Sequence, residues 1–328
     1  MTDSGRVRRK VAVADDLQVA SGLRRQEAPQ PAVVRVEPCI ATGTGRQIDA
    51  RQIVMGLAQD LNTDRIELPG FPEIVARIHR ALGDSGVAAK DVVRLVASEP
   101  ALAARLLQLA NSAAFNKSGR EVSDLKAAIT GLGFNIVRSQ ATAFAMKQLE
   151  QQEWLQPIRP VLADIWRTSN GVAALCGGVA RQLRDVQAVR PDEAMSAGLF
   201  HLIGKLYLFA RARQESIDPH AIADWEHALN DWHATIARTI LDHWKIPARI
   251  AEAVENQNAI FDAGNSDLSA LTRILCGAKL HVRLRKAGAP PEPEAEAALA
   301  RLRIEGRPFE ELAKAAQADT EAMRAAMG

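Results

Sequence analysis

The side chains that could carry out metal chemistry lie in the second half of the sequence. His201 and His233 are the central pair, and Asp242 and His243 follow shortly after them. Histidines and carboxylates that converge on one or two divalent cations lower the pKa of a bound water and neutralise phosphate charge. Two histidines are too few for such a site, so Asp242 or His243 would have to complete it, with hydrogen-bond partners that orient the ligands. The alternative, which we favour, is that both are hydrogen-bonded histidines inside a packed core.

The sequence offers no other catalytic motif. It contains no GxSxG turn and no pairing of Cys with His in a credible context. Gly204-Lys205 is not a phosphate-binding loop, because that loop needs four residues between its glycines and a Ser or Thr after the Lys. We expect Gly204 to let two helices pack closely and Lys205 to extend its ammonium group to solvent.

The elements that must position these side chains are helices. The chain has 328 residues, of which 47% are hydrophobic and only 4% aromatic. Strands prefer β-branched and aromatic side chains, so this composition favours helices. Helical periodicity begins near Ile48 and runs almost to the end, and no convincing period-2 stretch appears in the second half. We therefore predict an all-α protein.

Pro and Gly residues divide the sequence into four regions. We predict a flexible tail over residues 1–46 and a bundle of short helices over 47–156. We predict a second helical half over 157–287 and a helical extension over 288–328. The extension could pack back on the second half or serve as a docking helix. The helices that we expect in the second half lie at about 161–183, 192–212, 219–229, 231–244, 248–257 and 267–285.

Several residues in the first half are suited to start helices. Leu68-Pro69-Gly70-Phe71-Pro72 is a sharp break, and Pro72 is well placed to open the next helix. Ser98 is a candidate cap for the helix that begins near Pro100, and Asp124 is a candidate cap for a short helix after it.

The charge balance argues against a dedicated nucleic-acid binder. The 41 basic and 39 acidic residues give a formal net charge of +2, without the basic surplus that such proteins carry. Nucleic-acid binding through the basic tail and the Arg-rich stretch from Arg273 to Arg301 stays a minor alternative.

Cysteine usage and hydropathy indicate a cytoplasmic protein. Cys39, Cys176 and Cys276 show no CxxC spacing, which is typical of a reducing compartment, and we expect Cys176 and Cys276 to be buried. No segment has the length of a transmembrane helix or the apolar core of a signal peptide, so we expect no membrane contact.

Two series of segments resemble a known family. The first series is Leu68-Pro69-Gly70-Phe71-Pro72-Glu73, Glu99-Pro100-Ala101-Leu102, Leu106-Leu107-Gln108-Leu109-Ala110-Asn111-Ser112 and Gly131-Leu132-Gly133. The second is Ile165-Trp166-Arg167-Thr168-Ser169, the run from Ala197 to Leu206, His233, and Trp244-Lys245-Ile246-Pro247. In order and spacing they resemble the HD-related output domain (HDOD) family over about residues 50–285. The resemblance implies an N-terminal helical bundle packed on a C-terminal half related to HD metal-dependent phosphohydrolases.

The resemblance also implies which residues of this chain occupy the positions of the metal ligands. The first histidine of the catalytic superfamily falls at Thr168, the His-Asp pair at His201-Leu202, and a further histidine at His233. The late paired histidines fall at Gln257-Asn258, and the final aspartate falls at Lys279. Leucine has no lone pair to offer, and an ammonium group repels a cation. The resemblance therefore implies no metal, no cofactor and no enzymatic activity.

The remaining motif residues are expected to be structural. They are Leu68, Pro69, Pro72, Pro100, Leu102, Asn111, Ser112, Gly204 and Lys205. Asn111-Ser112 could form part of a ligand pocket, but a role in tying the helix end to the following loop is favoured. Trp225, Trp232 and Trp244 are expected in the core, with a partner-binding patch as the alternative.

These observations favour a non-catalytic bacterial signal-transduction module that binds a protein partner or a small ligand. The sequence does not identify the partner, and self-association is one option. The alternative is a metal-dependent phosphohydrolase with an atypical ligand set around His201 and His233.

Overall fold

Helices dominate the part of the chain that the structure describes. The structure, a computed structural model, describes residues 72–84, 86–183, 189–214, 230, 232–261, 268–288 and 290–327. Its only strands form a two-stranded hairpin, so the all-α prediction is confirmed for these residues. The predicted tail 1–46, the motif residues Leu68 and Pro69, Trp225 and the predicted helix 219–229 lie outside the described residues.

The first helices form a bundle. They are α3 (Glu73–Gly83), α4 (Ala89–Ala97), α5 (Pro100–Asn111), α6 (Leu125–Leu132) and α7 (Phe134–Glu150). Asp124 caps α6 as predicted, because its carboxylate accepts a hydrogen bond of 2.8 Å from the backbone N–H of Ala127. The prediction for Ser98 was wrong. Its hydroxyl donates to the carbonyl of Leu95 at the end of α4, and Glu99 occupies the cap position of α5.

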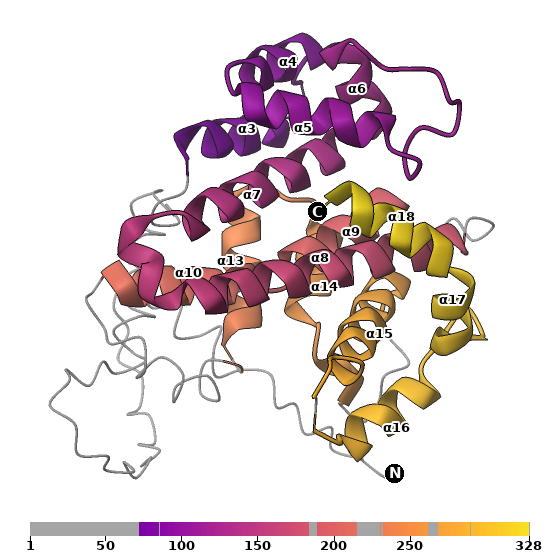
Figure 1. Ribbon diagram of the computed structural model, residues 1–328. Coiled ribbons are helices and arrows are strands. Elements are labelled where there is room, and N and C mark those ends of the chain that lie inside the picture. Colours follow the sequence, from indigo (N-terminus) through magenta and orange to yellow (C-terminus); the bar gives the residue numbers. More distant parts are fainter. Residues whose placement is uncertain are drawn as a thin grey trace, which may run out of the picture. The chain divides into compact units, whose positions relative to one another are not determined.

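Helix α7 connects this bundle to the rest of the described chain. It packs against α3, α5 and α6 on one side and against α8 and α9 on the other, and it lies between these groups in Figure 1. Most of its residues are consequently buried, including the polar side chains of Arg138, Ser139, Gln140 and Thr142. An even distribution of apolar residues around the helix is what burial on two sides requires.

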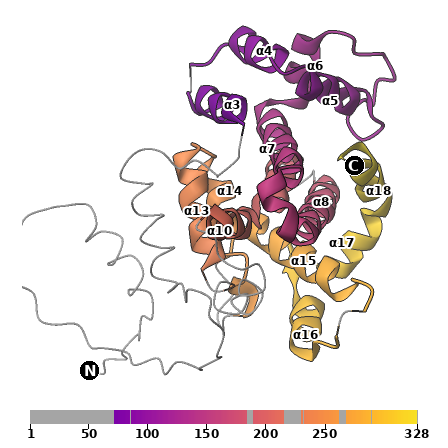
Figure 2. The ribbon, with the colours of Figure 1, turned by 60° about the vertical axis from the view of Figure 1, so that its left-hand side comes forward.

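The second group of helices packs around α8. It consists of the 3₁₀ helix η1 (Glu153–Ile158), α8 (Arg159–Arg181), α9 (Pro191–Phe200), α10 (Ile203–Gln214), α13 (His233–His243), α14 (Ala248–Glu255), η2 (Ala259–Phe261) and α15 (Ala270–Leu284). Helix α8 contacts both α9 and α15, while α13 bridges α10 and α14 (Figure 2). Cys176 on α8 and Cys276 on α15 are buried free thiols, as predicted.

The predicted helix 192–212 is two helices. Helix α9 ends at Phe200 and α10 begins at Ile203, and the intervening His201-Leu202 forms a turn. No Pro or Gly stands at this junction, so the helical pattern of the sequence continues through it. The break places His201 at the end of α9, where its ring can reach back to the carbonyl of Gly198.

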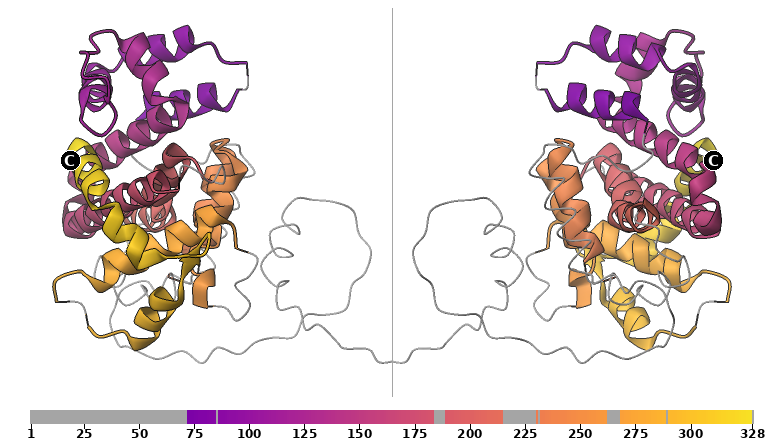
Figure 3. Two further views of the ribbon diagram at one scale, coloured as in Figure 1. Left: turned by 90° about the vertical axis from the view of Figure 1, so that its right-hand side faces the viewer. Right: turned by 90° about the vertical axis from the view of Figure 1, so that its left-hand side faces the viewer.

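The C-terminal segment packs back onto the earlier helices. It comprises α16 (Pro293–Arg301), β1 (Arg303–Ile304), β2 (Arg307–Pro308), α17 (Phe309–Ala315) and α18 (Gln317–Met327). Helix α18 lies along α8 and also contacts α5 (Figure 3). Met323 and Met327 join the same apolar cluster as the buried residues of α3 to α7. Arg181 forms an ion pair of 2.8 Å with Asp319, which holds α18 on α8.

The hairpin between α16 and α17 was not predicted. Its two strands are two residues long, with Arg303 opposite Pro308 and Ile304 opposite Arg307. Both residues of the connecting turn, Glu305 and Gly306, have positive φ angles of 50° and 77°. Strands of two residues are too short to show an alternation of apolar and polar residues, so the sequence pattern could not predict them.

The described residues belong to one compact unit, although the sequence predicted three regions within it. The boundaries at 156/157 and 287/288 stay predictions. Among the described residues, no helix combines the length and the apolar character that crossing a bilayer requires.

Gly204 sits where two helices meet with no room for a side chain. A Cβ at this position would lie 2.0 Å from the carbonyl oxygen of His233 and 3.0 Å from the backbone nitrogen of Ala237. The start of α10 therefore packs directly on the backbone of α13, and only glycine permits that approach.

We expect Gly204→Ala to lower the free energy of unfolding by about 3 kcal/mol, because backbone atoms cannot rotate away from the added methyl. The control is Gly131→Ala, where nothing lies within 4 Å of the added carbon. Alanine at that helical position should be neutral or stabilising by about 0.5 kcal/mol. Urea denaturation of both variants measures the difference. Equal stability of the two would contradict the close contact at Gly204.

Candidate functional site

Five of the residues aligned with metal ligands come together at one place. They are His201 after α9, His233 at the start of α13, Gln257 and Asn258 after α14, and Lys279 on α15. We call these five residues the lysine cluster. Leu202 follows His201 in the chain and is buried. Thr168 is half-buried on α8, and no hydrogen bond joins it to the cluster within the described residues.

Lys279 is the centre of the lysine cluster. Its ammonium group donates to Gln257 Oε1 at 3.0 Å and to Asn258 Oδ1 at 2.5 Å. Burial lowers the pKa of Lys279 to about 8, so the group is still mostly protonated at neutral pH. The two amide oxygens satisfy two of its three N–H donors, and this makes a partly buried ammonium tolerable.

Gln257 links the ammonium group to the turn that carries His201. Its amide nitrogen donates to the backbone carbonyls of His201 at 3.0 Å and Val254 at 2.9 Å. Since the amide oxygen accepts from Lys279 at the same time, one side chain holds α14, α15 and the turn after α9 together. Histidine could not do this, because it lacks the combination of a two-hydrogen donor and a two-lone-pair acceptor.

His201 is held as a neutral imidazole. Its Nδ1 lies 2.7 Å from the carbonyl oxygen of Gly198, and because a carbonyl can only accept, Nδ1 carries the proton. Burial, with a further contribution from the positive charge of Lys279, lowers the pKa of His201 to about 3. The ring is therefore uncharged at neutral pH.

His233 is also neutral, but its hydrogen bonding is incomplete. The side chain is 2% exposed, and Nδ1 has no partner among the described residues. Burial and then the charges of Lys279 and Lys205 lower its pKa to about 2. Lys205 is only half-buried, yet it is near enough to act on both histidines.

The residues present do not fit a divalent metal. Asp242, which could have completed a site, is exposed and forms an ion pair of 2.6 Å with Arg238. Across the described residues, no group of three or more His, Cys, Asp or Glu side chains has the arrangement that a metal ion needs. The lysine cluster contains two imidazoles and no carboxylate, and a cation already stands in it as the ammonium of Lys279.

Comparison with known proteins places this geometry in a family. Residues 68–260, more than half of the chain, match the HDOD domain. The chain belongs to the HDOD family.

Solved structures share the HDOD fold with this chain. A protein of Shewanella amazonensis SB2B, named as a candidate metal-dependent phosphohydrolase, is 24% identical with a TM-score of 0.63, covering 85% of this chain and 99% of that one. An HDOD domain protein of unknown function from Geobacter sulfurreducens is 20% identical with a TM-score of 0.52, covering 85% of this chain and 98% of that one. Identities at this level show a common fold and do not transfer an activity.

One curated relative is longer than this chain. An uncharacterized protein of Treponema pallidum (strain Nichols) is 24% identical in an alignment 227 positions long, which covers 64% of this chain and 41% of that protein. The aligned part thus spans less than half of that relative.

The HDOD motif residues that are described make structural contacts. Pro100 is the first residue of α5, and Leu102 is fully buried. Asn111 donates to the carbonyls of Leu107 and Val122 and accepts from the N–H of Val122 at 2.8 Å, so it ties the end of α5 to the following loop. Pro72 precedes α3 as its cap residue, and the hydroxyl of Ser112 donates to the carbonyl of Leu109.

Trp244 and Trp232 differ in burial, although both were expected in the core. Trp244 is buried and stacks on His79 with ring centroids 4.5 Å apart. His79 also bonds the hydroxyl of Thr142 at 2.8 Å, and the sequence analysis missed this histidine although it lies on the apolar face of α3 with Val75. Trp232 is 40% exposed, so the prediction that it lies in the core was wrong.

The lowered pKa of Lys279 gives the stability of the protein a dependence on alkaline pH. Between the folded pKa of about 8 and the ordinary lysine pKa of 10.5, the unfolded chain holds a proton that the folded chain has released. The contribution of Lys279 to the free energy of unfolding therefore rises with pH between these two pKa values and is constant below them. We expect the unfolding free energy of the wild type to increase relative to that of Lys279→Met between pH 8 and 10.5, while Lys126→Met on the exposed side of α6 should follow the wild type. Urea denaturation from pH 7 to 10.5 measures both. A difference between the wild type and Lys279→Met that does not change with pH would show that Lys279 titrates alike in the folded and unfolded chain.

Proposed function

We propose that this chain is a non-catalytic regulatory module of bacterial signal transduction that acts by binding a protein partner or a small ligand. The observation that supports this most strongly is the hydrogen bonding of Lys279 to Gln257 and Asn258. An ammonium group takes the place of a metal, and two amides take the place of its histidine ligands. Residues that would bind a metal in a hydrolase have thus been replaced by residues that hydrogen-bond to one another.

Loss of a proton from Lys279 would not restore a metal site. Deprotonation removes the repulsion, and the pKa of about 8 makes it inexpensive near neutral pH. The lysine cluster would then contain only neutral donors, and position 202 next to it would still be a leucine. The charge of a divalent cation would therefore stay uncompensated. A second metal, which in-line displacement at phosphorus often uses, would have even fewer ligands.

Fold and family also support a binding role. Members of one fold host unrelated functions, so the argument must come from the site, and here the site is closed by its own side chains. Helical layers such as α7 on α8 and α9 provide a rigid support for surface recognition. Self-association and binding to another protein are both compatible with this proposal.

Metal content and turnover provide the direct test. The full chain, incubated with Mn²⁺, Fe²⁺ or Zn²⁺ and desalted, should retain far less than one metal ion per chain by elemental analysis. It should not hydrolyse p-nitrophenyl phosphate or cyclic nucleotides above the buffer rate. Stoichiometric metal and turnover that are lost in His201→Ala but kept in His281→Ala would establish the phosphohydrolase alternative and overturn the proposal.

A test in cells addresses the regulatory role. A chromosomal His201→Gln variant should behave like the wild-type strain, because glutamine can still donate to the carbonyl of Gly198 and no catalytic imidazole is required. The comparison is a deletion strain, scored on the phenotypes in which that strain differs from wild type. If His201→Gln reproduces the deletion while its protein level and thermal stability match the wild type, the imidazole has a chemical role and the module is not purely a binding protein.

A further inference from the structure

A cavity of about 510 Å³ lies next to the lysine cluster, because the Cys276 thiol in its lining donates to the backbone carbonyl of Gln257 at 3.4 Å. Its walls come from η2, α15, α16 and β1, and its volume falls in the range of about 300–1,000 Å³ that small-molecule sites occupy. The side chains in its lining that the argument uses are Phe261, Arg273, Glu294, Arg301 and Arg303. The HDOD match ends at residue 260, so nearly all of this lining lies beyond the part of the chain that the family describes.

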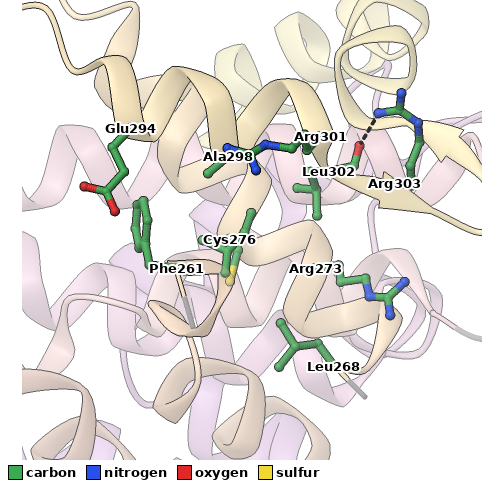
Figure 4. A pocket seen from close by; sticks show the side chains of 10 residues that line it. Phe261, Leu268, Arg273, Cys276, Glu294, Ala298, Arg301, Leu302 and Arg303 are labelled. Carbon is green, nitrogen blue, oxygen red and sulfur yellow. Dashed lines mark hydrogen bonds between the residues drawn. The ribbon is translucent and has the colours of Figure 1, made fainter. Parts of the chain in front are cut away.

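The floor of the cavity is apolar and uncharged. Cys276 and Leu302 are buried beneath it, and both stand at its centre in Figure 4. Burial raises the pKa of the Cys276 thiol to about 11, so the sulfur carries no negative charge at neutral pH. An uncharged floor leaves the electrostatics of the cavity to the ionised side chains of its rim.

Three arginines dominate that rim. Arg303 donates to the carbonyls of Ala300 at 2.9 Å and Leu302 at 3.3 Å, and Arg301 donates through Nε to the carbonyl of Ala297 at 3.1 Å. These bonds to carbonyls in α16 and just after it hold each guanidinium in place. In the described chain, neither Arg301 nor Arg303 is ion-paired with a carboxylate. Because a guanidinium has five N–H donors, each can still bind an anion.

The opposite end of the cavity has a different chemistry. Figure 4 places Phe261 and Glu294 at one end and Arg273 and Arg303 at the other, with Arg301 and Leu302 between them. Phe261 is 40% exposed, so part of its ring remains available to a stacking partner. Glu294 stands beside it as an acceptor for N–H groups.

We propose that this cavity binds a mononucleotide, with its phosphate at the Arg273–Arg303 end and its base on Phe261. Arginine forks match phosphate oxygens in pairs, and an aromatic ring stacks on any base. Glu294 would accept a hydrogen bond from an amino group of the base and would repel a second phosphate at that end.

Calorimetric titration of the full chain tests the site. The probes are AMP, GMP, CMP and UMP, with ribose 5-phosphate and inorganic phosphate as ligands that lack a base. We expect saturable binding of at least one nucleotide, with Arg303→Gln weakening it and ribose 5-phosphate alike by about tenfold. Phe261→Ala should weaken the nucleotide by about tenfold and leave ribose 5-phosphate unchanged.

Two control variants match the test variants in exposure. Arg94→Gln removes an exposed arginine on α4, and Trp232→Ala removes an aromatic ring that is exposed to the same fraction as Phe261. Neither should change binding, and thermal melting should show all four variants folded. The proposal is overturned by the absence of saturable binding for all six probes, or by affinities that Arg303→Gln and Phe261→Ala leave intact. Binding of a single-stranded oligonucleotide without any mononucleotide would also overturn it, in favour of nucleic-acid recognition.

This site does not depend on the regulatory role argued above. Failure of nucleotide binding would leave the metal and turnover results unchanged. Conversely, a bound nucleotide that is not hydrolysed would fit a regulatory module, and a metal-dependent hydrolysis lost in His201→Ala would assign activity to the other site.

Discussion

An ammonium group inside a helical protein needs acceptors for its N–H donors, and here the acceptors come from the loop after α14. Lys279 on α15 reaches Gln257 and Asn258, and Gln257 passes the contact on to the backbone of His201. This chain of hydrogen bonds joins the turn after α9 and the loop after α14 to the interior of α15.

The positive charge of Lys279 has an effect on its surroundings as well. Together with burial it keeps His201 and His233 neutral, since a second positive charge beside the ammonium would be unfavourable. Neutral imidazoles can be buried at moderate cost when one nitrogen finds a partner, as Nδ1 of His201 does at Gly198. The cluster thus carries a single full charge, and that charge has its own hydrogen-bond acceptors.

Much of this arrangement could be predicted from residue types. Most of what could not be predicted depends on contacts between residues that are distant in sequence. Leu202 and Lys279 argue against a metal site because an aliphatic side chain offers no lone pair and an ammonium group repels a cation. The hydrogen bonds of Gln257 could not be predicted, because they join residues that are distant in sequence. Periodicity located most helices, but it continued through the turn at His201 and missed a hairpin with two residues per strand. The exposure of Trp232 depends on tertiary packing, which a side chain's apolar character does not determine. The basic cavity combines Phe261 with Arg303 from segments more than forty residues apart, so only the fold brings them together.

The position of α18 has a consequence for the order in which the protein can fold during synthesis. Met323 and Met327 fill the same apolar cluster as residues of α3 to α7, and Arg105 on α5 donates a hydrogen bond to the carbonyl of Met327. The first bundle leaves the ribosome long before these residues are made. Its interior therefore stays incomplete, with apolar surface exposed, until translation has passed Met327. The early helices thus complete their packing only after α18 has been made, so native packing of the bundle is a late step.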